Sequence, residues 1–234
     1  MFSRAQLIPK IFSIDASARV SLVSGGLVVF DAGGTEAHSG VATTFDYSNL
    51  TISAGLTNSA LIAHICFYEA PTTGVTVVWD PTGANQSLTQ LGSVSAGGSF
   101  GQVELWGLVN PVAGNKVIRV TWTSAATRVF VCGTSWSGVN QTGGATSFPN
   151  ATTNTGSGTT TSVTVTSGVG HAVVAEHSDR DGTVFVSIDP TEVYHIESFT
   201  TNGSNRAAGA ASVTLHMTFG SNPWASIGTD IAPA

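Results

Sequence analysis

The feature that most constrains the fold is an alternation of apolar and polar residues, in short runs that follow one another along most of the chain. Period-two alternation is typical of β-strands, and no window keeps the 3.6-residue period of an amphipathic helix. Turn sequences with Pro or Gly separate the runs, as in residues 71–74 and 80–83. The pattern predicts an all-β fold, an antiparallel two-sheet β-sandwich that is jelly-roll-like.

The composition of the chain agrees with this prediction. Charged residues make up only 9% of the 234 residues, against roughly a quarter in typical soluble domains. The polarity comes from Gly, Ser, Thr and Asn, which suit turns and strands, whereas helix surfaces favour Glu, Lys, Arg and Gln. The length is ordinary for one sandwich, so residues 20–234 are expected to form a single domain.

Two segments stand apart from the strand pattern. Residues 137–161 are almost entirely Ser, Thr, Gly and Asn, and we expect a long surface loop there. Residues 1–19 are rich in apolar side chains and contain Pro9, which permits either a first edge strand or an arm that docks on a neighbouring subunit. The side chains proposed for assembly through this arm are Phe2, Leu7, Ile8, Ile11 and Phe12.

Charge and hydropathy exclude several classes of partner. The formal charge is −6, and the eight Lys and Arg residues are scattered, so a nucleic-acid or anionic membrane surface is not expected. No apolar run reaches the length of a transmembrane helix. Pro9, Lys10 and Asp15 interrupt the start of the chain, so we expect folding without classical secretion.

Two patterns resemble reactive motifs but have simpler interpretations. The segment Gly97-Gly98-Ser99-Phe100-Gly101 fits the nucleophile elbow G-x-S-x-G, which needs a preceding strand and a following helix. A strand is predicted after it, so a hairpin turn is the better interpretation. Cys66 and Cys132 both lie in predicted strands, where they could be joined in a disulfide or remain buried thiols.

A group of possible metal ligands lies between residues 176 and 197. If the two strands in this region pair, their oxygen and nitrogen atoms could hold a divalent ion, although the spacing matches no established ligand frame. The alternative is a turn stabilised by Asp side chains. The candidates are His177, Asp179, Asp181, His195 and Glu197, and Glu176 with Glu197 is a further, weaker carboxylate pair. No metal or cofactor is predicted.

Several isolated residues are expected to serve packing. His64 and His216 lie within apolar strands and are interpreted as strand histidines with satisfied hydrogen bonds. The five tryptophans could form a platform that stacks on sugar rings, but packing between sheets is the preferred interpretation. These tryptophans are Trp79, Trp106, Trp122, Trp136 and Trp224.

Four segments carry a resemblance to known sequences. Residues 103–111 resemble an element ELWYLxNP, residues 136–142 resemble FSGVDQT, and residues 208–214 and 224–228 resemble AGAASVT and WAxIG. In this order they are similar to a broad family of uncharacterised β-sandwich proteins from bacterial surface proteins and phage genomes. The resemblance covers about residues 27–234 and implies a fold, but it supplies no catalytic residue.

The sequence departs from that family in two places. Residues 77–84 have a longer turn than the family element VTYNGVxLT, and the amino-terminal arm has no counterpart. The arm favours the phage members. We therefore expect a non-enzymatic phage virion accessory protein, a capsid decoration or head-fibre component located on the virion and in the host cytoplasm during assembly. Its expected partners are copies of itself and capsid proteins. The alternative is a carbohydrate-binding or adhesion module that recognises host-surface glycans.

Overall fold

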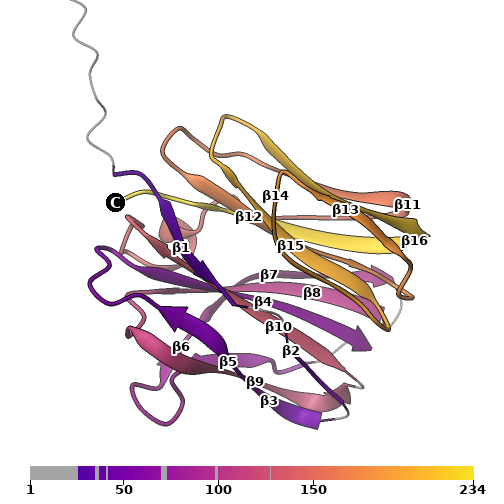
Figure 1. Cartoon of the computed structure of the whole chain (residues 1–234), viewed down its shortest axis with the longest axis horizontal. Coiled ribbons are helices and arrows are strands. Elements are labelled where there is room, and N and C mark those ends of the chain that lie inside the picture. Colours follow the sequence, from indigo (N-terminus) through magenta and orange to yellow (C-terminus); the bar gives the residue numbers. More distant parts are fainter. Residues whose placement is uncertain (1–25, 35–36, 41, 70–72, 98–99, 127) are drawn as a thin grey trace, which may run out of the picture.

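The computed structural model describes residues 26–234, apart from 35–36, 41, 70–72, 98–99 and 127. Within these residues the chain forms sixteen strands and one helical turn, α1 (Gly144–Ser147). All strand pairs are antiparallel, and the strands form three sheets that lie in layers (Figure 1). The predicted all-β sandwich is confirmed, with one sheet more than the two predicted. No helix in the described part is long and apolar enough to cross a membrane.

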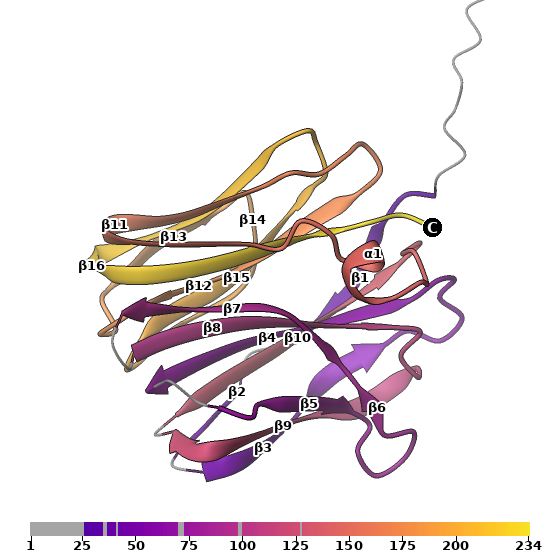
Figure 2. The same cartoon turned by 180° about the vertical axis from the view of Figure 1, so that it is seen from behind.

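Two of the sheets come from the first part of the chain. The strands of the central sheet are β1 (Val29–Gly33), β2 (Ala37–Ser39), β4 (Ala60–Glu69), β7 (Thr89–Gly97), β8 (Phe100–Val109) and β10 (Val129–Ser137). The strands of the small sheet are β3 (Ala42–Ile52), β5 (Thr76–Trp79), β6 (Gln86–Ser87) and β9 (Gly114–Ala126). These two sheets pack face to face, with the small sheet as the outer layer (Figure 2).

The strand order of these two sheets is that of a jelly roll. The central sheet runs β1-β10-β4-β8-β7, with β2 also paired to β10, and the small sheet runs β3-β9-β5-β6. The chain crosses repeatedly from one sheet to the other, so strands that are neighbours in space are distant in sequence. The order β1-β10-β4-β8 facing β3-β9-β5-β6 is the arrangement of an eight-stranded jelly roll, and β7 extends one edge.

The remaining sheet comes from the second part of the chain. The strands of this folded sheet are β11 (Thr152–Val165), β12 (Ala172–Asp179), β13 (Phe185–Asp189), β14 (Thr191–Glu197), β15 (Thr201–Ala208) and β16 (Val213–Ile231). Their order is β11-β16-β12-β15-β14, and β13 pairs with β16 beyond the end of β12. The folded sheet covers the face of the central sheet that the small sheet leaves open (Figure 1).

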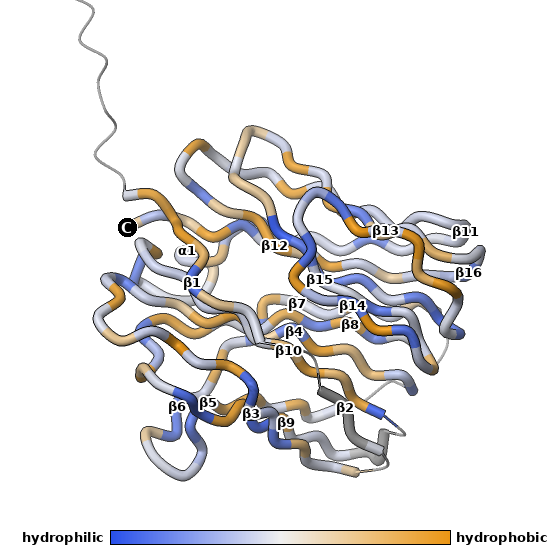
Figure 3. The backbone as a smooth tube through the Cα atoms, in the orientation of Figure 1, coloured by the Kyte–Doolittle hydropathy of each residue, from blue (hydrophilic) through white to orange (hydrophobic). Residues whose placement is uncertain are grey.

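Strand β4 shows why the central sheet is covered on both sides. Its residues alternate between two cores: Leu61 and Ile65 pack toward the small sheet, whereas Ile62 and Cys66 pack toward the folded sheet. The first eight residues of β4 are all buried. Figure 3 shows the same apolar runs along the central strands. A strand that is apolar on both faces requires a covering layer on each side.

The period-two alternation expected of strands is present in β8. Val103 and Leu105 lie in the core shared with the folded sheet, and Trp106 and Leu108 pack in the core shared with the small sheet. Glu104 is on the same face as Trp106, buried, and accepts hydrogen bonds from the side chains of Trp106 at 2.7 Å and Gln102 at 2.5 Å. The burial of a carboxyl group is thus compensated by two donors.

The predicted loop over residues 137–161 is wrong in its second half. Strand β11 begins at Thr152 and pairs with β16 along nearly its whole length, with an irregularity at Gly158, whose φ is 132°. The Asn154 side chain donates to the carbonyl of Ser162, and the Asn150 side chain donates to that of Thr166, so β11 folds back on itself about Gly158. Threonine-rich sequence without charge is compatible with a strand when a partner is present. That partner lies some sixty residues further along the chain.

The two cysteines are buried free thiols. The Cys66 thiol donates to Ser178 Oγ at 3.3 Å, and the Cys132 thiol donates to the carbonyl of Gly34 at 3.1 Å. Burial raises the pKa of Cys66 to about 12. The sequence left a disulfide and two buried thiols as alternatives, and the structure has two buried thiols.

Leu105 allows a direct test of the shared core. Leu105→Ala is expected to lower the free energy of unfolding by about 2–5 kcal/mol, because the side chain is fully buried between the central and folded sheets. Leu105→Asp adds an unpaired buried carboxyl group and is expected to prevent soluble folding. The control is Val186→Asp, at a side chain that is 64% exposed. Soluble expression and urea unfolding are the measurements, and a stable Leu105→Asp protein would contradict this packing.

Candidate functional site

The five residues considered as metal ligands do not come together. His177 and Asp179 lie on β12, whereas His195 and Glu197 lie on β14, and β15 runs between these two strands. His177 and His195 are both in register with Gly203 of β15, one on each side of it. The direct strand pairing on which the metal hypothesis depended is therefore wrong. No group of three possible ligands is found among the residues that the structure describes.

His177 is fully buried and its ring nitrogens already have partners. Nδ1 lies 2.7 Å from Thr161 Oγ1 and 2.8 Å from Ser226 Oγ, and Nε2 lies 3.1 Å from Asn205 Oδ1. Burial lowers the pKa of His177 to about 4, and the hydrogen bond with Asn205 opposes this shift. The imidazole is therefore neutral, and its hydrogen bonds join β12 to β11, β15 and β16.

Asp179 stabilises a turn, which was the alternative interpretation of this region. Its carboxylate accepts hydrogen bonds from the backbone N–H groups of Gly182 at 3.0 Å, Thr183 at 2.8 Å and Thr201 at 2.7 Å. The Thr183 hydroxyl is a fourth donor, at 2.6 Å. These donors hold the end of β12 to the start of β15, and the carboxylate is buried.

The other candidate ligands lie at the surface in local contacts. His195 Nδ1 is 2.7 Å from Glu192 Oε1, and the His195 ring stacks on Phe185 with ring centroids 3.8 Å apart. Glu197 accepts a hydrogen bond from the backbone N–H of Phe185. Asp181 is exposed, and its carboxylate is 3.8 Å from the Arg180 guanidinium.

The G-x-S-x-G sequence does not form a nucleophile elbow. Strands β7 and β8 pair with Gly97 opposite Phe100, and no helix follows, since β8 continues to Val109. Ser99 itself lies outside the described residues. A strand on each side is the arrangement of a hairpin connection, which was the preferred interpretation.

A buried polar cluster joins the central sheet to the folded sheet. His64 of β4 lies at its centre, with Nε2 3.1 Å from Thr134 Oγ1 and Nδ1 3.0 Å from Ser204 Oγ. Glu176 of β12 accepts a hydrogen bond from the Tyr194 hydroxyl at 2.5 Å. The other oxygen of Glu176 is 3.6 Å from His64 Nδ1. The interpretation of His64 as a strand histidine with satisfied hydrogen bonds is confirmed.

Burial determines the protonation of this cluster. Burial lowers the pKa of His64 to about 3, so its imidazole is neutral. Burial raises the pKa of Glu176 well above 4.5, and the hydrogen bond from Tyr194 opposes that rise. Both side chains have zero exposure, so no substrate can reach them, and Glu176 cannot act with Glu197 on a sugar. Sequence reasoning missed Tyr194 and Ser204, whose only signal is their place on alternating strands.

An open groove lined mainly by apolar residues lies on the surface of the described part of the chain. The groove has a volume of about 600 Å³ and lies between residues 27–30, residues 169–172 and residues 206–209, with Trp136 also in its wall. It therefore lies where β1, the start of β12 and the end of β15 meet. Val28 donates a backbone hydrogen bond to the carbonyl of Gly170 at 2.9 Å, which joins two of these walls.

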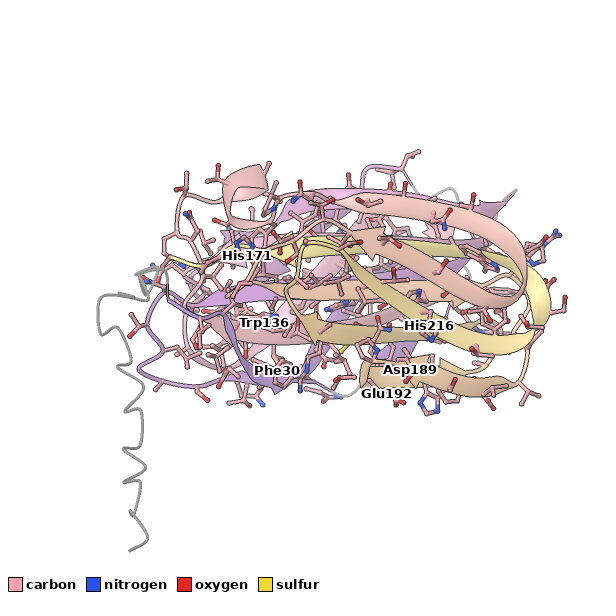
Figure 4. The ribbon with its side chains drawn as sticks, turned by 90° about the horizontal axis from the view of Figure 1, so that it is seen from above. Phe30, Trp136, His171, Asp189, Glu192 and His216 are labelled. Carbon is pink, nitrogen blue, oxygen red and sulfur yellow. The ribbon has the colours of Figure 1, made fainter. Side chains whose placement is uncertain are left out.

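Aromatic and charged side chains shape the groove (Figure 4). The rings of Phe30 and Trp136 meet edge to face, with centroids 5.2 Å apart. The Arg206 guanidinium lies 4.1 Å from the centroid of Phe30, in a cation–π contact. His171 Nδ1 lies 2.7 Å from Asp230 Oδ2.

The rim of the groove exposes large apolar side chains. Val169 is 93% exposed, Leu27 is 67% exposed and Val29 is 53% exposed. All three residues line the groove. The first described residue, Gly26, adjoins this rim, so residues 1–25 join the body here. The assembly residues Phe2, Leu7, Ile8, Ile11 and Phe12 lie outside the described residues.

The tryptophans pack in the interior, as preferred from the sequence. None of the five is more than 7% exposed, so they cannot form a stacking platform at the surface. Comparison with known proteins adds no further assignment: no protein-family model, no curated protein and no solved structure matches this chain.

Glu176→Gln tests the buried cluster. The folded-state pKa of Glu176 lies above 4.5, so its contribution to stability is fully present below pH 4.5 and is lost as the pH rises through the folded pKa. Glutamine keeps an acceptor for Tyr194 and cannot ionise. The stability of the variant relative to the parent is therefore expected to increase from pH 4.5 to pH 8, as measured by urea unfolding.

Glu192→Gln is the matched control, because that carboxylate is 41% exposed and its pairing with His195 is worth little. A Glu176→Gln protein whose stability relative to the parent did not change between these pH values would show that Glu176 is not buried as a neutral group.

Proposed function

We propose that this protein is a non-enzymatic structural component of a phage virion, of the capsid-decoration or head-fibre type. The observation that carries the proposal is the exposed apolar groove at the place where residues 1–25 join the body. The titratable groups that would suggest catalysis are either buried with partners or lie in local surface contacts. Among the described residues, the apolar groove is therefore the feature on which we base a function.

The energetics of the arm support a role in assembly. Burying each of its large apolar side chains contributes about 1.5–3 kcal/mol. Ordering the segment costs about 1–2 kcal/mol per residue in backbone entropy. For six side chains and nineteen residues the entropic cost exceeds the gain from burial, so we expect the arm to order only where it also gains backbone pairing or a receiving surface. The groove supplies such a surface.

The charge distribution is compatible with assembly through this arm. Residues 1–25 carry Arg4, Lys10 and Arg19 against Asp15, a formal charge of +2. The total charge of −6 leaves −8 for residues 26–234. The positive segment is attracted to the negative body of another copy, whereas the two bodies repel each other. The proposed partners are accordingly other copies of this chain and capsid proteins, with a location on the virion and in the host cytoplasm during assembly.

The glycan-binding alternative has less support. It depended on exposed aromatic residues that stack on sugar rings, and all five tryptophans are buried. The groove has two partly exposed rings, Phe30 and His171. The face of Phe30 is occupied by Arg206, and His171 is paired with Asp230.

Deletion of residues 1–19 tests the proposed function. The truncated protein is expected to keep its free energy of unfolding within about 0.5 kcal/mol, because the described strands do not include those residues. Self-association or co-sedimentation with phage particles from the source organism is expected to weaken by at least about tenfold. Light scattering after size-exclusion chromatography and mass spectrometry of purified particles are the measurements. A truncated protein that assembles normally would refute the role of the arm.

A further inference from the structure

We infer that the groove binds residues 2–14 of a second copy of this chain, with the grooves of the two copies facing each other. This inference rests on the proposed function in assembly and names the partner of the groove. The alternative occupants are the same segment of the same copy and a segment of another virion protein.

The position of the groove makes a reciprocal exchange possible. The described chain begins at Gly26, and Leu27 already lines the groove, so the segment is tethered beside the groove of its own copy. When two copies face each other about a twofold axis, each segment starts beside the groove of the other copy. Such an interface is closed, and both copies make the same contacts.

The length of the connecting residues permits this exchange. Residues 15–26 separate the apolar segment from Leu27, and twelve extended residues span up to about 40 Å. This distance is sufficient to cross from the rim of one groove into a facing groove.

The chemistry of the segment matches the groove. Residues 2–14 contain six large apolar side chains, and Pro9 disfavours a regular helix, so the sequence favours an extended apolar peptide. The groove walls contain Val28, Phe30 and Ala172 and few polar side chains.

The rim distinguishes a second copy from the chain's own segment. Val169, Leu27 and Val29 are more than half exposed on the rim itself. A segment of the same copy that entered the groove would fill its interior and leave the outward-facing rim in water. A second copy that faces the groove covers the rim as well, and this burial of apolar surface favours the dimer.

Two glutamate variants test the surface. Val169→Glu places a charge on the rim at a fully accessible side chain, so folding is expected to be unaffected. The dissociation constant of the dimer, from sedimentation equilibrium, is expected to rise by at least about tenfold. The matched control is Val184→Glu, at an exposed valine (71%) outside the groove, for which the constant is expected to change by less than about twofold. Equal effects of the two variants would overturn the inference.

Cysteine cross-linking identifies the occupant. Separately prepared Leu7→Cys and Val169→Cys proteins are mixed and oxidised, and a disulfide between residues 7 and 169 can then form only between copies. Cys66 and Cys132 are buried and do not compete. Peptide mass spectrometry is expected to find this disulfide in the mixture, and not in a mixture of Leu7→Cys with Val184→Cys. A disulfide that forms only within the double variant Leu7→Cys/Val169→Cys would overturn the inference in favour of the chain's own segment.

The failure of this inference differs from that of the proposed function. If deletion of residues 1–19 abolishes particle attachment while neither the Val169→Glu variant nor cross-linking gives the expected result, the second-copy inference is wrong and the virion role stands. If the cross-linked dimer forms but the protein never co-sediments with particles, the inference is supported and the virion role is wrong.

Discussion

The burial of the central sheet on both faces is the constraint on which the rest of the structure depends. Antiparallel sheets commonly pack one face on a core and leave the other to solvent. Here β4 carries apolar side chains in both directions, so the jelly roll formed with the small sheet satisfies only one of its faces. The folded sheet covers the other face. Its own outer face is in turn covered where β11 and β16 bend back, which brings Val163 and Val165 over Gly228.

This two-sided burial also explains the polar cluster between the sheets. A buried imidazole and a buried carboxyl group are unfavourable as charges, and the pKa shifts of His64 and Glu176 both favour the neutral forms. Neutral groups in a dry interior still need hydrogen bonds. Thr134 and Ser204 supply them to His64, and Tyr194 supplies one to Glu176 Oε1, whereas Glu176 Oε2 has no hydrogen-bond partner. The cluster contains residues from both sheets, so its hydrogen bonds constrain how the two sheets are positioned relative to each other.

The sequence predicted the features that depend on local pattern. The alternation along β8 placed Leu105 and Trp106 on opposite faces, and the short turns implied antiparallel pairing. It did not predict the third sheet, because a strand buried on both faces loses the alternation that assigns it to one core. It also missed β11, whose threonine-rich sequence reads as a loop until β16 is known to pair with it. The Glu176–His64 contact joins residues more than a hundred positions apart, and no spacing rule reveals such a contact.

The low charge of the chain limits how this protein can recognise a partner. Surfaces that associate through ion pairs need clustered charges, and the few ion pairs of the described residues are local, such as Arg119 with Asp46 across β9 and β3. Among the described residues, the large exposed apolar side chains outside the groove are Val184, Val186 and Phe199. The free energy of association must therefore come from apolar contact at a few places. Among the described residues the groove beside β1 combines an open volume with an exposed apolar rim, and the most apolar segment without a described contact is attached at its edge. This coincidence of a receiving surface and a tethered apolar segment is the physical basis of the assembly role that we propose.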